Sequence, residues 1–322
     1  MNIKDPAEIL RQAAWKEIQR LELELYVADL DANGFTVIPP SIASPGDLHK
    51  RLLARILDLS EEDSGVRPDL VAGENPVAFK GSELGKAEDD APFGQYIPSL
   101  IFEGPAFEEA LLNPVLLAMS TYLCGFSAVL SSMSCFVKGP TRSALQLHAD
   151  TFLPAPMPAH ALLCNGTYVL TEFNRENGAT AFVPGSHKFQ RQPREEERFL
   201  TGQNANSNAV ASEAAPGSLV FWHGNTWHGA FNRTVPGLRV SMPVLMARPS
   251  MRTEEDLFGK IPQAVLDRNP ARFAVLTQQG IVNGWHSKEH SKLRPAQARE
   301  VMRKFYEEVD LPNADADIPL YG

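Results

Sequence analysis

The sequence predicts a mainly β core with helical flanks at both ends, its strands forming a barrel or a sandwich. Between Ser127 and Ala247, short strand-like runs follow one another, separated by Gly, Pro and Asn. Apolar residues at helical spacing precede this region, and helical character returns after Pro249. The chain shows no internal repeat and no long linker. We therefore expect a single domain over 1–322, with a helical flank (1–126), the β core (127–249) and a second helical flank (250–322).

In the first flank, helical spacing of apolar residues predicts one long helix from Pro6 to Asn33, stopped by Asn33-Gly34. A short strand, FTVI, follows and ends at Pro39-Pro40. A second helix is expected from about Pro45 to Leu57. After it, SEEDSG (60–65) and KAEDDAP (86–92) are acidic segments typical of solvated turns.

The last helix of this flank is predicted by Asn113-Pro114, an N-cap followed by proline at the first helical position, and it should end at Gly125. In the second flank, Asn269-Pro270 should open one helix, and an amphipathic helix should run from Pro295 to Val309. The core strands are expected in SAVLSSMSCFVKG (127–139), LQLHAD (145–150), ALLCNGTYVLTEF (161–173), ATAFVPG (179–185), SLVFW (218–222), TWHGAF (226–231) and LRVSMPVLMA (238–247).

Composition narrows the class of protein. The chain has 30 Lys and Arg against 39 Asp and Glu, a net charge of −9, and no basic cluster, which argues against a nucleic-acid partner. No apolar signal segment and no run long enough to span a membrane is visible. The three cysteines are widely spaced in apolar stretches, as buried free thiols in a reducing compartment would be. We expect a cytoplasmic protein with a small-molecule substrate, whose amphipathic terminal helices could form a homodimer face.

Two histidines and an aspartate are candidate metal ligands. On a strand, His148 and Asp150 point to the same face, and they form the only His-x-Asp/Glu pair in the chain. A surface histidine beside a turn aspartate is the alternative. His223 and His228 could each supply a third ligand; His228 is preferred because aromatic residues surround it (Trp222, Trp227 and Phe231). Two imidazoles and a carboxylate form the facial triad of non-haem Fe(II) sites, which leaves three positions open.

Arg239 lies eleven residues after His228, in a strand-like run where Leu238, Val240 and Met242 are apolar. A surface strand position is the alternative, but an arginine on an inner strand requires a buried anion. Its planar guanidinium matches a carboxylate, so a dicarboxylate co-substrate would suit it.

Together these residues resemble the phytanoyl-CoA dioxygenase-like family of Fe(II)/2-oxoglutarate-dependent oxygenases. The resemblance extends over LDANGFTVIPP (30–40), ENGATAFVPGSH (176–187), PGSLVFW (216–222) and WHGAFNRT (227–234), followed by Arg239. It implies a double-stranded β-helix, the jelly-roll or cupin-like core. It also implies Fe(II) held by His148, Asp150 and His228, 2-oxoglutarate bound through Arg239, and O2 as the oxidant.

Further contacts are expected around this site. Gln146 and Thr180 match polar positions that line the co-substrate in similar enzymes, although each could be an ordinary polar residue of a barrel interior or mouth. Ser241 is also expected to contact the co-substrate. Phe152 and Met157, in the Pro-rich loop that ends at His160, could line the substrate site, as could Trp227 and Phe231. The remaining histidines have simpler interpretations: His187 as turn architecture, and His286 and His290 as a solvated helix end.

The resemblance implies oxidation of a C–H bond of a small, fairly apolar molecule, such as a specialised metabolite or lipid-like acid, with release of succinate and CO2. Related halogenases replace the acidic ligand by a small residue, so Asp150 favours hydroxylation or another oxidation. A non-catalytic cupin-like protein holding structural zinc or a ligand is the alternative. An oxygenase acting on protein or nucleic acid would need a long basic groove; the pair Arg233 and Arg239 alone does not indicate one.

Overall fold

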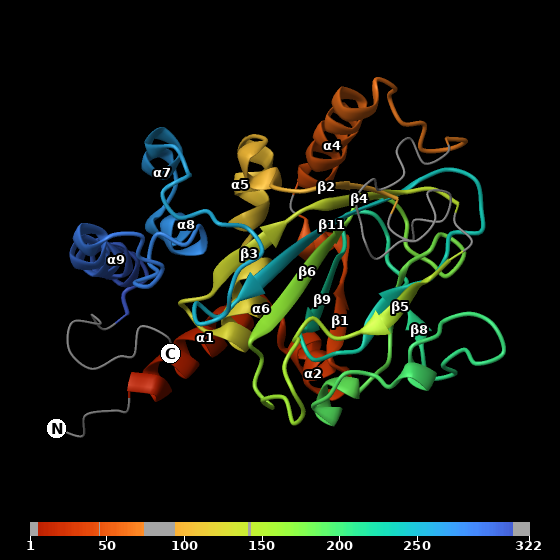
Figure 1. The fold of residues 1–322 in the computed structure, drawn as a ribbon, viewed down its shortest axis with the longest axis horizontal. Helices are drawn as coiled ribbons and strands as arrows, with labels where there is room; N and C mark the ends of the chain where they lie inside the picture. The colour runs from red at the N-terminus through yellow and green to blue at the C-terminus, as the bar shows by residue number, and fades with distance from the viewer. Residues whose placement is uncertain (1–5, 45, 74–93, 141–142, 312–322) are drawn as a thin grey trace.

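The core of the protein consists of two antiparallel β-sheets, seen in a computed structural model that describes residues 6–44, 46–73, 94–140 and 143–311 (Figure 1). The larger sheet has the order β1 (Phe35–Ile38), β9 (Leu219–His223), β6 (Leu163–Val169), β11 (Arg239–Ala247), β4 (Cys135–Lys138) and β2 (Gln95–Ile97), with β3 (Val129–Met133) also paired to β11. The smaller sheet has the order β5 (Leu145–His148), β10 (His228–Ala230), β7 (Thr180–Phe182) and β8 (Val210–Ala211). The predicted β core with helical flanks is confirmed, as two sheets and not one closed barrel.

The N-terminal flank contributes more than helices, since β1 and β2 complete the larger sheet at its two edges. Its helices are α1 (Pro6–Arg20), α2 (Glu24–Asn33), α3 (Pro40–Ala43), α4 (Leu48–Ser64), α5 (Pro105–Leu111) and α6 (Pro114–Cys124), with a short 3₁₀ helix η1 (Leu100–Phe102). The single long helix predicted from Pro6 is therefore wrong: the chain breaks at Glu22, whose φ is 58°. The stop at Gly34 is confirmed, with φ 84° and its N–H donating to the Leu30 carbonyl at 2.7 Å.

The acidic segment SEEDSG forms the last turn of α4: Glu61, Glu62 and Asp63 are exposed, as predicted, but the predicted turn is wrong. Leu59 and Ser60 are buried and continue the helical spacing of Leu52 and Ile56, so packing extends the helix as far as Gly65. The segment KAEDDAP and Pro45 lie outside the described residues.

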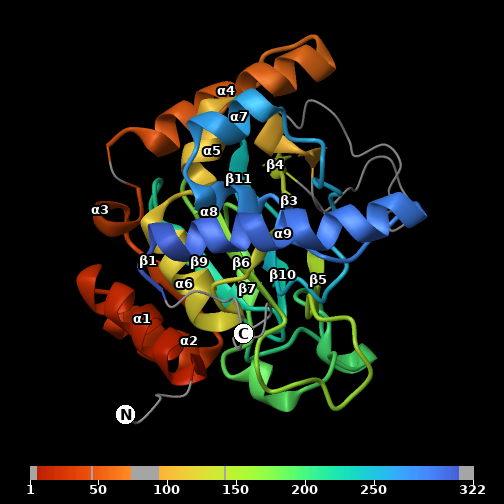
Figure 2. The same cartoon turned by 90° about the vertical axis from the view of Figure 1, so that its left-hand side faces the viewer.

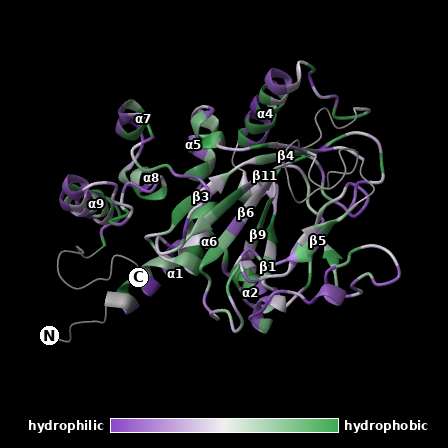
Figure 3. Cartoon of the chain, in the orientation of Figure 1, coloured by the Kyte–Doolittle hydropathy of each residue, from purple (hydrophilic) through white to green (hydrophobic). Residues whose placement is uncertain are grey.

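Helix α6 covers the outer face of the larger sheet. Its predicted N-cap is confirmed, because Oδ1 of Asn113 accepts a hydrogen bond from the Val115 N–H at 2.9 Å. A Cβ at Gly166 of β6 would lie 2.5 Å from the Leu116 side chain, so glycine allows the helix to approach the strand. All three cysteines are buried and free, as predicted. In Figure 3, green hydrophobic residues concentrate in α6 and the strands beneath it.

The C-terminal flank packs its helices in the order α7 (Gln263–Arg268), α8 (Ala271–Leu276) and α9 (Lys288–Glu308). As predicted, α8 opens after Asn269-Pro270. Helix α9 begins before the predicted Pro295, because Ser287 Oγ caps it by accepting the His290 N–H at 3.0 Å. Figure 2 shows α9 running across one side of the molecule beside α8. No helix among the described residues combines the length and apolar character needed to cross a membrane.

The loops that link the strands carry two further 3₁₀ helices, η2 (Ser186–Phe189) and η3 (Glu195–Glu197). In the smaller sheet, β10 lies between β5 and β7, so His228 pairs with His148 on one side and with Phe182 on the other. A bulge interrupts the β10–β5 register between His228 and Ala230, where Ala230 pairs with Leu145. The register thus brings together two histidines that are far apart in the sequence.

Candidate metal centre

Three predicted ligands, His148, Asp150 and His228, meet at the end of β5 and the start of β10, and are called the triad below. Oδ1 of Asp150 lies 3.4 Å from Nε2 of His228 and 4.0 Å from Nε2 of His148. The three potential ligand atoms lie within 4.8 Å of one another. One ion between them could therefore contact all three.

Both imidazoles are oriented by backbone carbonyls. Nδ1 of His148 lies 2.9 Å from the Gln146 carbonyl, and Nδ1 of His228 lies 3.1 Å from the Thr226 carbonyl. A carbonyl can only accept, so each Nδ1 carries the proton and each Nε2 presents its lone pair. Burial, together with neighbouring His228, lowers the pKa of His148, which favours the neutral ring that binds metals.

The Asp150 carboxylate is oriented by a hydrogen bond from Trp222. Nε1–H of Trp222 donates to Oδ2 of Asp150 at 3.1 Å, which leaves Oδ1 facing the histidines. The Trp222 ring lies 5.0 Å from that of His228 and 5.4 Å from that of Phe182. These rings pack against His228 and help to fix the direction of its ligand atom.

The triad opens into a cavity of about 250 Å³ between the two sheets, called the triad cavity below. Apart from the triad, its walls come from both sheets and from a loop after β11: Tyr96, Ser132, Ser134, Phe136, Leu145, Asn165, Thr167, Thr180, Trp222, Gly229, Ala230, Arg239, Ser241, Pro243, Leu245 and Glu254. Three of the predicted co-substrate contacts, Arg239, Thr180 and Ser241, thus share a cavity with the triad.

Arg239 lies on the inner side of β11 and is only 4% exposed. Nη2 donates to Ser241 Oγ at 3.3 Å and Nη1 donates to the Gly178 carbonyl, while Nε is buried without a hydrogen-bond partner. No carboxylate of the described residues forms an ion pair with it. Burial, and secondly Arg233, lower its pKa to about 10. An anion in the cavity would offset this buried charge.

Lys138, which the sequence did not single out, is a second buried basic side chain beside Arg239. It pairs with Arg239 across β4 and β11 and is fully buried, with Nζ donating to the Phe231 carbonyl at 2.7 Å. Burial, and secondly Arg239, hold the pKa of Lys138 well below its usual range. The signal in the sequence was a lysine inside the apolar strand CFVK. A bound anion would favour the charged form of both Lys138 and Arg239, so this pair suits an anionic ligand.

Gln146, expected to face the triad with His148, is exposed and does not line the triad cavity. The bulge between β5 and β10 breaks the two-residue alternation, so Leu145 lines the cavity instead. Simple alternation along the strand could not reveal this.

The four predicted substrate contacts also lie outside this cavity. Phe152 is 77% exposed, and Met157 is buried under its own loop, where its N–H donates to the Gln190 carbonyl. Trp227 and Phe231 pack with Leu147 in a separate apolar cluster. Trp227 precedes His228 and Phe231 follows Ala230. Because successive side chains of a strand point to opposite faces, both are directed away from the triad cavity.

His223 does not join the triad. It follows Trp222 on β9 and therefore points to the other face of the larger sheet, where its ring lies 5.6 Å from that of His187. Burial, and secondly His187, lower the pKa of His223 to about 4. His286 and His290 are near the surface, 4.0 Å apart between ring centres, at the start of α9.

An antiparallel two-sheet core with a His-x-Asp and a distant His at one cavity defines a cupin-like non-haem metal oxygenase. The phytanoyl-CoA dioxygenase (PhyH) family model matches residues 30–241, more than half of the chain. The chain belongs to the phytanoyl-CoA dioxygenase family, which confirms the resemblance seen in the sequence.

Curated relatives agree with this placement. Dioxygenase af480 of Aspergillus fumigatus is 28% identical over 174 residues, 52% of this chain and 52% of its own. Dioxygenase aneA of Aspergillus aculeatus is 24% identical over 275 residues, 83% of this chain and 85% of its own. The chain spans about half the length of the first of these relatives. Neither comparison supports the non-catalytic alternative.

Two solved structures show the same fold. The carbocyclase SnoK from nogalamycin biosynthesis, described as non-haem and α-ketoglutarate-dependent, matches with a TM-score of 0.53 and 20% identity over 76% of this chain and 90% of its own. HygX from Streptomyces hygroscopicus, with nickel and 2-oxoglutarate bound, matches with a TM-score of 0.51 and 16% identity over 70% and 86%. The predicted cupin-like fold class is confirmed.

Proposed function

We propose that this chain is an Fe(II)- and 2-oxoglutarate-dependent dioxygenase that oxidises a C–H bond of a small molecule. His148, Asp150 and His228 hold the iron, and Arg239 binds the distal carboxylate of 2-oxoglutarate. The donor set supports this assignment, because two neutral imidazoles and one carboxylate suit Fe(II) and leave positions open for a chelating co-substrate. Family membership points to the same chemistry.

The observation that carries the proposal is the buried charge at one end of the triad cavity. Arg239 lines the cavity, is buried beside Lys138, and has no carboxylate partner among the described residues. Buried cations without a counter-ion are unfavourable, so the site is built for an anion. A dicarboxylate fits both ends, one carboxylate at Arg239 and the other near the triad.

The side chains that line the triad cavity have different roles in binding the metal and the co-substrate. Asp150, fixed by Trp222, and the two imidazoles present their ligand atoms in one direction. Thr180 and Ser241 supply hydroxyl groups beside Arg239. Bound iron would supply the oxidising chemistry, in which 2-oxoglutarate and O2 give succinate, CO2 and the oxidised substrate. The protein's contribution is to place the substrate next to the metal and to exclude water.

The other residues that line the triad cavity indicate the chemical character of the substrate. Leu145, Ala230 and Leu245 offer an apolar surface, in keeping with the fairly apolar molecule expected from the sequence. Beside Leu245, its cross-strand partner Ser132 donates through Oγ to Glu254 Oε2 at 2.5 Å, and both Ser132 and Glu254 line the cavity. A compact substrate with an apolar body and a hydrogen-bond donor directed at Glu254 fits this arrangement.

Succinate formation tests the proposal. Purified protein supplied with Fe(II), 2-oxoglutarate and O2 should release succinate, even slowly in the absence of substrate, and Arg239→Ala should reduce the rate at limiting 2-oxoglutarate by at least about tenfold. Arg20→Ala is the matched control, because Arg20 is exposed and pairs only with Glu17 among the described residues. Equal succinate release by Arg239→Ala and Arg20→Ala would remove Arg239 from the co-substrate site.

A further inference from the structure

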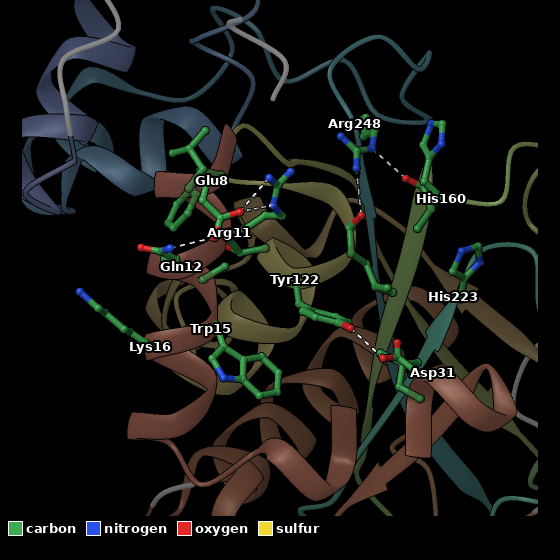
Figure 4. Close-up of a pocket in the computed structure, with 18 of the residues that line it drawn as sticks. Glu8, Arg11, Gln12, Trp15, Lys16, Asp31, Tyr122, His160, His223 and Arg248 are labelled. Carbon is green, nitrogen blue, oxygen red and sulfur yellow. Dashed lines mark hydrogen bonds and ion pairs between the residues drawn. The ribbon is translucent and has the colours of Figure 1, made fainter. Parts of the chain in front are cut away.

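A second, larger cavity lies on the other face of the larger sheet, here called the back cavity (Figure 4). It has a volume of about 1090 Å³ and shares no lining residue with the triad cavity. Strand β9 separates the two: Trp222 lines the triad cavity, and the next residue, His223, lines the back cavity. A molecule bound there would not touch the triad.

One side of the back cavity is apolar. Helix α1 contributes Leu10, Ala14 and Trp15, and Phe126 follows the end of α6. Leu10, Ala14 and Phe126 belong to one hydrophobic cluster, while Trp15 is 40% exposed at the rim. This side can accept the apolar body of a ligand.

The opposite side carries nitrogen donors. Figure 4 shows Arg248, His160 and His223 gathered there, across the cavity from Trp15. Arg248 donates through Nε to the Ala161 carbonyl at 2.8 Å and through Nη2 to the Leu123 carbonyl at 3.1 Å. These carbonyls fix the guanidinium but do not neutralise it, and no carboxylate of the described residues pairs with it.

His223 offers a buried donor without an acceptor. His223 is only 5% exposed. Its Nδ1 accepts a hydrogen bond from the Asn225 N–H at 3.0 Å. The proton of the neutral ring is therefore on Nε2, which is buried and has no hydrogen-bond partner among the described residues. The Ala159 carbonyl lies near enough to raise the pKa of His223, but it does not meet Nε2 with the geometry of a hydrogen bond. Buried N–H groups normally find an acceptor.

The acidic residues of the cavity wall are already engaged. Glu8 pairs with Arg11 at 2.8 Å, and Asp31 accepts a hydrogen bond from the Tyr122 hydroxyl at 2.8 Å. Neither forms a hydrogen bond or an ion pair with Arg248 or His223. The donor side of the cavity therefore remains free to bind an external anion.

We propose that the back cavity binds an amphipathic carboxylic acid, separately from the reaction at the triad. The carboxylate accepts hydrogen bonds from His223 and from the His160–Arg248 side, and the apolar body lies along Leu10, Ala14 and Phe126. A carboxylate supplies both the acceptor that Nε2 of His223 needs and the negative charge that Arg248 needs. The inference does not depend on iron or 2-oxoglutarate.

Calorimetric titration of the metal-free 322-residue chain with decanoate tests this site. Decanoate should bind, and decanol, which has the same chain without the charge, should bind at least tenfold more weakly. His160→Glu should weaken decanoate binding at least tenfold by repelling the carboxylate. His286→Glu is the matched control, because it places the same charge at an exposed histidine far along the chain. It should bind decanoate as the wild type does.

Two further variants locate the bound molecule. Ala159→Trp fills the cavity from an exposed wall position and should abolish decanoate binding, whereas His228→Ala in the triad should leave it unchanged. If decanoate fails to bind the wild type, or binds His160→Glu as tightly as His286→Glu, the proposal is overturned. Loss of binding in His228→Ala but not in His160→Glu would also overturn it, by placing the acid in the triad cavity. None of these results bears on succinate release, so the proposed function is tested separately.

Discussion

The indole Nε1–H of Trp222 donates a hydrogen bond to Oδ2 of Asp150 across 3.1 Å, joining β9 of the larger sheet to the triad at the end of β5. This bond occupies one carboxylate oxygen and directs the other toward His228 and His148. The sheet that carries Arg239 thus also orients the acidic ligand.

Trp222→Phe should weaken metal binding by about 10- to 100-fold, the usual effect of removing a hydrogen bond to a metal ligand. The ring remains apolar and similar in shape, so the fold should persist. Competition of Fe(II) or Mn(II) against a chelator would measure the affinity. Trp285→Phe is the control, since Trp285 is 54% exposed and its Nε1–H donates to the Val282 carbonyl. Equal affinity in both variants would show that the Trp222 bond does not tune the site.

Lys138→Met should raise the KM for 2-oxoglutarate by about tenfold, which corresponds to ~1.4 kcal/mol, with a smaller effect on kcat. The substitution removes a buried amine that a bound carboxylate would hold in its charged form, but keeps the volume of the side chain. The unfolding temperature should change little, because removing an amine that is costly to charge in the interior opposes the loss of the hydrogen bond to Phe231. Steady-state kinetics and thermal unfolding would measure the two effects. Lys260→Met, at an exposed lysine, is the control and should leave the KM for 2-oxoglutarate unaltered. If Lys138→Met and Lys260→Met had the same KM, Lys138 would have no role in binding 2-oxoglutarate.

Glu255 should make stability fall as pH rises from 4.5 to about 7. Burial raises its pKa from 4.5 to about 7, so in this window the unfolded chain releases a proton that the folded chain retains. Glu255→Gln removes the penalty and keeps an oxygen for the N–H groups of Ser99 and Met133. Its unfolding temperature should match the wild type near pH 4.5 and exceed it at pH 8. Glu213→Gln, at an exposed position, is the control; the same pH-independent offset in both variants would contradict this account.

Asn113→Ala should lower the free energy of unfolding by roughly 1–2 kcal/mol. Oδ1 caps α6 through the Val115 N–H, and Nδ2 donates to the Ala43 carbonyl at 2.7 Å. Asn113→Ser keeps a neutral N-cap oxygen and loses the bond to Ala43, so its loss should be smaller. Urea unfolding of the three proteins would measure the order. If Ser were as destabilising as Ala, the contact with Ala43 and not the cap would dominate.

Local signals in the sequence predicted much of the fold. The αL stop at Gly34, the cap at Asn113 and the strand β11 depend on residues close to one another in the chain, and the structure contains all three. The break at Glu22 and the extension of α4 through Ser60 depend on packing against distant segments. For example, Ser60 Oγ donates to Gln95 Oε1 of β2, a strand that no local pattern predicted.

The candidate site divides in the same way. His-x-Asp spacing and the run around Arg239 predicted residues that the structure brings to one cavity. Gln146 was misplaced because a bulge depends on the partner strand, and Lys138 was missed because its importance comes from pairing with Arg239 across two strands. Glu254 reaches the cavity from a loop after β11, and no spacing rule connects it to the triad.

The most direct test of the proposed function is anaerobic absorption spectroscopy of the Fe(II)-loaded protein as 2-oxoglutarate is added. We predict a weak visible metal-to-ligand charge-transfer band in the wild type. It should be absent in His228→Ala, should need much more 2-oxoglutarate in Arg239→Ala, and should be unchanged in His286→Ala, an exposed histidine outside the triad cavity. No band in wild-type protein that is shown to contain iron would contradict the assignment of 2-oxoglutarate to this site.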